Sequence, residues 1–311
     1  MSRIHFPNTK PAPVLVVGSV AYDDIETPRA TSGRVLGGSA SFCALAAAYY
    51  APVRLVGVVG GDFEHKDTAR YEARGICLRG LKRDEAGPTF YWRGRYHENF
   101  NRRDTLDIRL GVFETFRPEL PEDYRDTPYV LLGNIAPALQ AHVLDAARRP
   151  KLVVADSMDL WINIARDDLH ALMRRVDVFI VNDSEAEQLT GETNAVRAGR
   201  RLREMGPSTV IVKKGEHGSL LFHADGLCAL PAYPVEELHD PTGAGDSFAG
   251  AFVGYLAAHD RTDFAAMRSA LAYATVTASL TVESFSCDRL EAAGAAEITR
   301  RLDALRSLVS V

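Results

Sequence analysis

Short β-branched runs alternate with stretches of helical spacing along most of the chain. Such runs are typical of buried parallel strands, and the alternation predicts a parallel sheet covered by helices. The predicted strands are Val14–Val17, Val53–Val59, Tyr129–Leu132, Leu152–Ala155, Val178–Val181 and Thr209–Lys213. The predicted helices are Ser39–Tyr50, Phe63–Arg74, Ala138–Arg148, Leu160–Arg174 and Ala195–Met205, with Ser39 as an N-cap. A hairpin is expected from Ser219 to Leu230, and mostly helix from Gly245 onward.

Residues 76–112 interrupt this rhythm, because they hold few helix signals and many aromatic and arginine residues. Within them, Thr89–His97 alternates as a strand does, with Trp92 and Tyr96 on one side and Arg93 and Arg95 on the other. We therefore expect residues 76–112 to form a small sheet that projects from the main domain. Ile25–Val35 is expected to supply its other strands.

Composition narrows the class of protein. The 311 residues are 46% hydrophobic and 25% charged, which predicts a large core rather than disorder. A net charge of −5 disfavours nucleic acid as a partner. No apolar run reaches the roughly 18–20 residues of a spanning helix, and the N-terminus lacks a signal-peptide pattern. The four cysteines have no zinc-binding spacing, so we expect reduced thiols in a cytoplasmic protein without membrane contact.

The stretch with the clearest chemistry is Asp240–Phe252, which reads DPTGAGDSFAGAF. A glycine-rich turn runs directly into a helix, whose first turn offers free N–H groups and the positive end of the helix dipole. These features predict an anion site, and Asp246 lies at its edge. Asp246 has two interpretations on physical grounds alone, a helix N-cap or a base that accepts a proton beside a bound phosphate. No P-loop pattern occurs in the chain.

This stretch resembles the C-terminal signature of the ribokinase-like sugar and nucleoside kinases, the PfkB family. The resemblance implies an ATP-dependent kinase with Asp246 as the catalytic base, and with Gly243, Ala244 and Gly245 as an anion hole. It also implies a single kinase domain over residues 1–311. The implied fold is a Rossmann-like α/β/α sandwich with three layers. A small β-sheet lid, formed by about residues 25–36 and 86–112, would cover the substrate.

Other motifs follow in the order of that family. Asp23, in GSVAYD, resembles the aspartate that accepts hydrogen bonds from substrate hydroxyls, and Gly37 and Gly38 resemble the double glycine that packs against the substrate. Asn182 and Glu185 resemble the N-x-x-E motif that holds Mg²⁺ through water. The residues implied to bind ATP are Asn182, Lys213, Gly215, Gly218 and Thr242. Asp240 is implied as a ligand of a monovalent cation such as K⁺.

The acceptor stays open, because the chain departs from the family pattern after the double glycine. Phe42 stands where sugar-specific members carry an asparagine, and it is a candidate for substrate contact or for core packing. Trp92, Asn101 and Asn134 are further candidates for substrate contact. Four arginines near the expected lid could bind an anionic group of the substrate or form a solvated face; they are Arg93, Arg95, Arg102 and Arg103.

Three functions are consistent with these residues. The first is a carbohydrate kinase, the second a nucleoside kinase, and the third a non-catalytic ligand-binding regulator. Base-dependent activity would separate the second from the first. The intact Asp246 motif argues against the third. Ribokinase-like lids also pair, which implies a possible homodimer.

Overall fold

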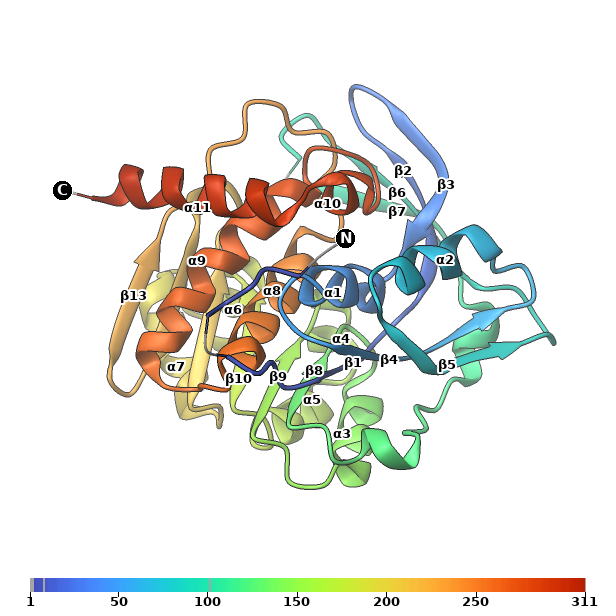
Figure 1. Ribbon diagram of the computed structural model, residues 1–311, viewed down its shortest axis with the longest axis horizontal. Helices are drawn as coiled ribbons and strands as arrows, with labels where there is room; N and C mark the ends of the chain where they lie inside the picture. Colours follow the sequence, from blue (N-terminus) through green and yellow to red (C-terminus); the bar gives the residue numbers. More distant parts are fainter. Residues whose placement is uncertain (1–2, 8, 101, 311) are drawn as a thin grey trace.

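The computed structural model describes residues 3–7, 9–100 and 102–310, and it has a nine-stranded main sheet. The strand order is β13-β12-β11-β10-β9-β8-β1-β4-β5, parallel except for the hairpin that β12 and β13 add at one edge (Figure 1). Its strands are β1 (Val14–Val17), β4 (Val53–Gly60), β5 (Cys77–Asp84), β8 (Tyr129–Leu132), β9 (Leu152–Asp156), β10 (Val178–Asn182), β11 (Thr209–Lys213), β12 (Ser219–His223) and β13 (Gly226–Leu230).

Helices cover both faces of this sheet, as the predicted α/β/α sandwich requires. Val14 and Val16 face one core, and Leu15 and Val17 face the other, because successive side chains of a strand alternate. The first core packs α1 (Ser39–Ala47), α2 (His65–Ala73), α8 (Ala244–His259), α9 (Phe264–Thr281), α10 (Asp288–Ala292) and α11 (Ala295–Val309). The second packs α3 (Pro137–Ala146), α4 (Asp159–Ile164), α5 (Arg166–Met173), α6 (Asp183–Thr190) and α7 (Ala195–Glu204).

A separate four-stranded sheet stands above the main sheet (Figure 1). Its order is β3-β2-β6-β7, with β2 (Ala21–Glu26), β3 (Thr31–Gly37), β6 (Phe90–Tyr96) and β7 (Arg103–Arg109). Strands β2 and β6 are parallel, and the outer pairs are antiparallel. The small sheet expected from the alternating aromatic and arginine residues is therefore present, and the predicted fold class is confirmed.

Three expectations about local structure were wrong. Residues 77–84 do not join the small sheet: they form β5, which pairs with β4 at the edge of the main sheet. Its sequence, CLRGLKRD, lacks an apolar run because an edge strand is only half buried. The predicted helix 160–174 is two helices, separated at Ala165 by non-helical backbone. Ser39 is not the N-cap of α1; Gly38 takes that position, with φ 89°.

The described residues include no helix that is long and apolar enough to cross a membrane. All four cysteines are unpaired thiols.

Candidate active site

Three neighbouring strands of the main sheet end in polar residues at one edge. Strand β9 ends at Asp156, β10 at Asn182 and β11 at Lys213. The register aligns Asn182 with Lys213, and the Lys213 Nζ lies 3.0 Å from the Asp156 Oδ2. Parallel strands bring their carboxyl ends to the same edge, which is where open α/β sheets bind ligands. Sequence reasoning missed Asp156, although a carboxylate directly after a buried strand is a signal that could have found it.

The turn before α8 is built from glycines that allow close approach of the backbone. Gly243 has φ 76°, and a Cβ atom there would lie 2.4 Å from the buried Phe42 ring. A Cβ atom on Gly245 would lie 2.8 Å from the Lys213 Nζ. The structure therefore brings the N-terminus of α8, with Ala244 as its first residue, to the lysine that ends β11. It also gives Phe42 a packing role beneath the turn.

Asp246 lies in the first turn of α8 and carries no side-chain cap bond, since the N-cap position belongs to Gly243. Burial raises the pKa of Asp246, and the neighbouring Asp156 raises it further. Lys213 and Arg103 act in the opposite direction. A carboxyl group with a raised pKa beside an anion site has the properties of a general base. The helix-cap interpretation of Asp246 is not supported by these contacts.

Asp23 lies on β2 beneath the double glycine. Its side chain is 5% exposed, and burial raises its pKa to about 7, with a further contribution from Asp240. The Gly38 N–H acts in the opposite direction and lowers the pKa. A Cβ atom on Gly37 would lie 2.0 Å from the Asp23 Oδ2, so only glycine leaves room for the carboxylate at this position.

The small sheet contributes one face to the same region. Trp92 on β6 is in register with Asp23 on β2, so both side chains point to one side of the sheet. Tyr96 lies four residues after Trp92 on the same face of β6 and is buried. Its hydroxyl accepts a hydrogen bond of 3.0 Å from the Thr242 Oγ1. The small sheet is thus joined directly to the glycine-rich turn.

Two asparagines, Asn134 and Asn101, are candidates for substrate contact. Asn134 follows β8, and its Oδ1 accepts a hydrogen bond of 2.8 Å from the Trp161 Nε1, so this amide also serves to hold α4. Asn101 lies outside the described residues.

Asn182 and Glu185 form a reciprocal capping box at the start of α6. The Asn182 Oδ1 accepts from the Glu185 N–H at 2.7 Å, and the Glu185 Oε2 accepts from the Asn182 N–H at 2.8 Å. Burial raises the pKa of Glu185 to about 7, while Lys213 opposes the shift. Within the described residues, no group of three or more His, Cys, Asp or Glu side chains is arranged to hold a metal ion. A single buried carboxylate still suits Mg²⁺, which keeps several waters when it binds.

Asp240 is fully buried and only half satisfied. Its Oδ1 accepts a hydrogen bond of 2.9 Å from the Thr242 N–H, whereas its Oδ2 has no hydrogen-bond partner. Burial raises its pKa to about 6. An unpartnered buried carboxylate oxygen costs free energy unless a cation or proton neutralises it.

The turn after β11 carries Gly215 and Gly218, the two glycines implied by the sequence to bind ATP. Gly215 opens a 3₁₀ turn, Gly215–His217, and a Cβ atom added there would meet open space. Gly218 has φ 85°, and a Cβ atom there would lie 2.0 Å from the Leu230 carbonyl oxygen, so only glycine fits the return into β12.

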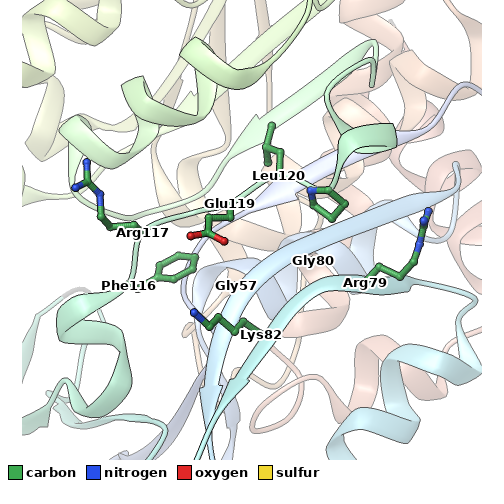
Figure 2. Close-up of a pocket in the computed structure, with 9 residues that line it drawn as sticks. Gly57, Arg79, Gly80, Lys82, Phe116, Arg117, Glu119 and Leu120 are labelled. Carbon is green, nitrogen blue, oxygen red and sulfur yellow. The ribbon is translucent and has the colours of Figure 1, made fainter. Parts of the chain in front are cut away.

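A pocket of about 350 Å³ lies away from all of these residues, beside β4 and β5. Figure 2 shows it between those strands and the segment that contains Phe116 and Leu120. It shares no lining residue with the site described above, and the chemistry of the chain is concentrated at the other location.

Comparison with known proteins agrees with this geometry. The model of the pfkB family of carbohydrate kinases matches residues 124–292, which is more than half of the chain. A cytidine kinase of Thermococcus kodakarensis is 29% identical over 80% of this chain and 88% of its own. A 2-dehydro-3-deoxygluconokinase of Thermoproteus tenax is 28% identical over 76% of this chain and 78% of its own. Among solved structures, a ribokinase II from E. coli in complex with ATP and Mg²⁺ superposes with a TM-score of 0.77 at 20% identity, over 94% of this chain and 99% of the other.

The fold and the match define a small-molecule kinase of the ribokinase type. The chain belongs to the PfkB carbohydrate kinase family. It is an ATP-dependent kinase, a phosphotransferase of that family.

Proposed function

We propose that this kinase phosphorylates a hydroxyl group of a sugar moiety held by Asp23, with Asp246 as the base. The observation that carries the proposal is that two buried carboxylates face the same region: the charge of Asp246 contributes to the raised pKa of Asp23. Asp23 would accept hydrogen bonds from substrate hydroxyls. Asp246 would accept the proton of the attacking hydroxyl, while the N–H groups of Gly243, Ala244 and Gly245 stabilise the transferred phosphoryl group.

The ATP phosphates would lie along the edge formed by β10 and β11. Lys213 would contact them as a point charge, and the turn Gly215–Gly218 and Thr242 would border the nucleotide. Asn182 and Glu185 would hold Mg²⁺ through its water shell. Bound Mg²⁺ offsets the charge of the phosphate oxygens.

A nucleoside acceptor is the second candidate, and Trp92 favours it. Trp92 stands beside Asp23, and its partner Ile108 on β7 is 52% exposed. Together they offer an apolar wall next to the carboxylate that would bind the sugar. Such a wall suits the flat face of a base. Asn134 is a further candidate for contact with the acceptor, whereas Phe42 packs beneath the glycine-rich turn.

Potassium is the cation that we propose for Asp240. Its unpartnered Oδ2 supports the assignment, because a monovalent ion would neutralise it beside the glycine-rich turn. A K⁺-supported, ATP-dependent enzyme with free thiols also suits the reducing cytoplasm, where we propose that it acts.

We expect release of ADP from Mg·ATP to depend on a sugar-containing acceptor and to be faster in K⁺ than in Li⁺. The test is a coupled ADP assay over free sugars, sugar acids, ribose and the common nucleosides, in both salts. Turnover of nucleosides over ribose would select the second candidate, and turnover of free sugars or sugar acids the first. ADP release in K⁺ that no acceptor accelerates would contradict the proposed function. Equal rates in both salts would contradict the role of Asp240.

We also propose that the small sheet mediates a homodimer. Strand β7 is an edge strand, and Leu106 and Leu110 on and beside it are 41% and 39% exposed. Exposed apolar edges are normally covered. Sedimentation should show a dimer that Leu106→Glu dissociates; a monomeric parent protein would contradict the proposal.

A further inference from the structure

One arginine of the small sheet differs from its neighbours in what surrounds it. Arg103 begins β7 opposite Tyr96, on the side of the sheet that carries Asp23 and Trp92. Its guanidinium lies 5.9 Å from the centroid of the Trp92 ring, and its charge lowers the pKa of the neighbouring Tyr96 hydroxyl, against the effect of burial. Because Tyr96 also contacts Thr242, Arg103 is connected to the glycine-rich turn through a single side chain.

The other arginines of β6 have a different role. Arg93 and Arg95 lie on the opposite face of the small sheet, where both form ion pairs with Glu26, the Arg95 Nε at 2.7 Å from its Oε2. Arg103 forms no ion pair with any carboxylate of the described residues. It is nevertheless exposed, and its positive charge lowers the pKa of both Asp23 and Asp246. An unpaired guanidinium in such a position is available to an anionic ligand.

Arg103 is linked to both sides of the proposed reaction, to Asp23 through its charge and to Thr242 through its strand partner Tyr96. Asp23 marks the acceptor side. Thr242 belongs to the glycine-rich turn before α8, called the anion turn from here on, and marks the ATP side. The group that passes between those sides is the phosphoryl group. Its three peripheral oxygens carry the negative charge of the transition state. The planar fork of an arginine matches two of those oxygens.

We propose that Arg103 contacts the γ-phosphoryl group during transfer and stabilises its charge from the side of the small sheet. This inference rests on the proposed function. In the step, the acceptor oxygen forms a bond to the γ-phosphorus as the bond from phosphorus to the β–γ bridging oxygen breaks. The bond electrons leave on ADP, and the acceptor proton passes to the Asp246 carboxylate. Arg103 faces the peripheral oxygens opposite the N–H groups of the anion turn, and Tyr96 positions its guanidinium.

The same guanidinium could instead bind a carboxylate or phosphate on the acceptor. An arginine that binds the transferred phosphoryl group and one that binds an anionic group of the acceptor affect the kinetics differently. Contact with the transferred group acts on kcat with any acceptor, including a neutral one. Contact with an anionic acceptor group acts mainly on the acceptor KM, and only for charged acceptors.

The test compares Arg103→Ala and Arg103→Lys with Arg95→Ala, an arginine on the opposite face of the same sheet. The acceptor is the best neutral sugar or nucleoside of the panel. We expect Arg103→Ala to lower kcat by about 10²–10³-fold with a smaller change in the acceptor KM. Arg103→Lys should retain only part of the rate, because an ammonium lacks the fork. Arg95→Ala should keep a kcat close to that of the parent protein.

Chemical rescue gives a readout that a structural role would not move. Added guanidinium at millimolar concentration should restore part of the Arg103→Ala rate and leave that of Arg95→Ala unchanged. An unchanged kcat in Arg103→Ala would overturn the proposal, as would a loss confined to the KM of anionic acceptors. Asp246→Asn, measured alongside, distinguishes failure of the proposed function from failure of the Arg103 proposal. If this variant is as active as the parent protein, the proposed function fails, whatever the Arg103 variants show. Melting temperatures of all variants check that each is folded.

Discussion

Replacing Asp246 by asparagine should reduce kcat by about 10²–10⁴-fold, since the amide keeps the shape of the side chain but cannot accept the acceptor proton. The KM for ATP should change little, because the N–H groups of the anion turn remain. The measurement is the steady-state rate with saturating Mg·ATP and the best acceptor. Asp303→Asn, on the exposed face of α11, is the matched control and should keep full activity. A near-normal rate in Asp246→Asn would refute the assigned role.

The pH dependence follows from the direction of the Asp246 pKa. Burial and Asp156 raise it, and the base works only when deprotonated, so kcat/KM should fall as the pH drops through a value above that of an ordinary aspartate.

The same raised pKa should make the contribution of Asp246 to stability less favourable as the pH rises. A carboxyl whose folded pKa is raised opposes folding at pH values above its unfolded pKa. Asp246→Asn should therefore raise the melting temperature at pH 8 and change it little at pH 3, and a variant less stable at pH 8 would contradict this.

Gly243→Ala should nearly abolish phosphoryl transfer. The residue has φ 76°, which costs an L-residue about 1–2 kcal/mol, and its new Cβ atom would lie 2.4 Å from the Phe42 ring. Phe42 is 1% exposed and cannot give way without disturbing the core, so the turn must move instead. Because transfer depends on donors placed to within a fraction of an ångström, we expect a loss in kcat of at least about 10²-fold.

Gly191→Ala separates backbone strain from the steric conflict. Gly191 has φ 74°, but no atom lies within 4 Å of the place that a Cβ atom would take, so this variant carries the same strain without the collision. It should lower the free energy of unfolding by about 1 kcal/mol and leave kcat intact. The comparison uses chemical denaturation together with the ADP assay. Equal kcat values for the two variants would show that the contact between Gly243 and Phe42 does not shape the anion turn.

The relatives differ in the acceptor that their names give. One is a cytidine kinase and another a 2-dehydro-3-deoxygluconokinase, at nearly equal identity to this chain. The proposed base, the anion turn and the edge of the main sheet would serve ATP binding and phosphoryl transfer, which such kinases share. Acceptor choice would depend instead on the small sheet, around Trp92.

The order of strands and helices was determined by the sequence itself. Buried parallel strands need uninterrupted β-branched runs, and β1, β8 and β11 begin and end where those runs do. The motif around Asp246 was equally local, because a glycine-rich turn followed by a helix builds an anion site from consecutive residues. Strand β5 escaped prediction, since a half-buried edge strand needs no apolar run.

Only the tertiary structure decided which distant residues meet. Asp156 reaches Lys213 because parallel strands end at a common edge, and nothing in the local sequence of β9 specifies this partner. The packing of α8 against the sheet places Asp246 where the charge of Asp156 raises its pKa. The arginines of the small sheet were indistinguishable by sequence. Strand register, including an irregularity between Arg93 and Gly94, assigns Arg93 and Arg95 to Glu26 on one face and Arg103 to the site on the other. A side chain's face depends on pairing with period two, so a shift of one residue reverses it, and pairing is a property of the assembled sheet.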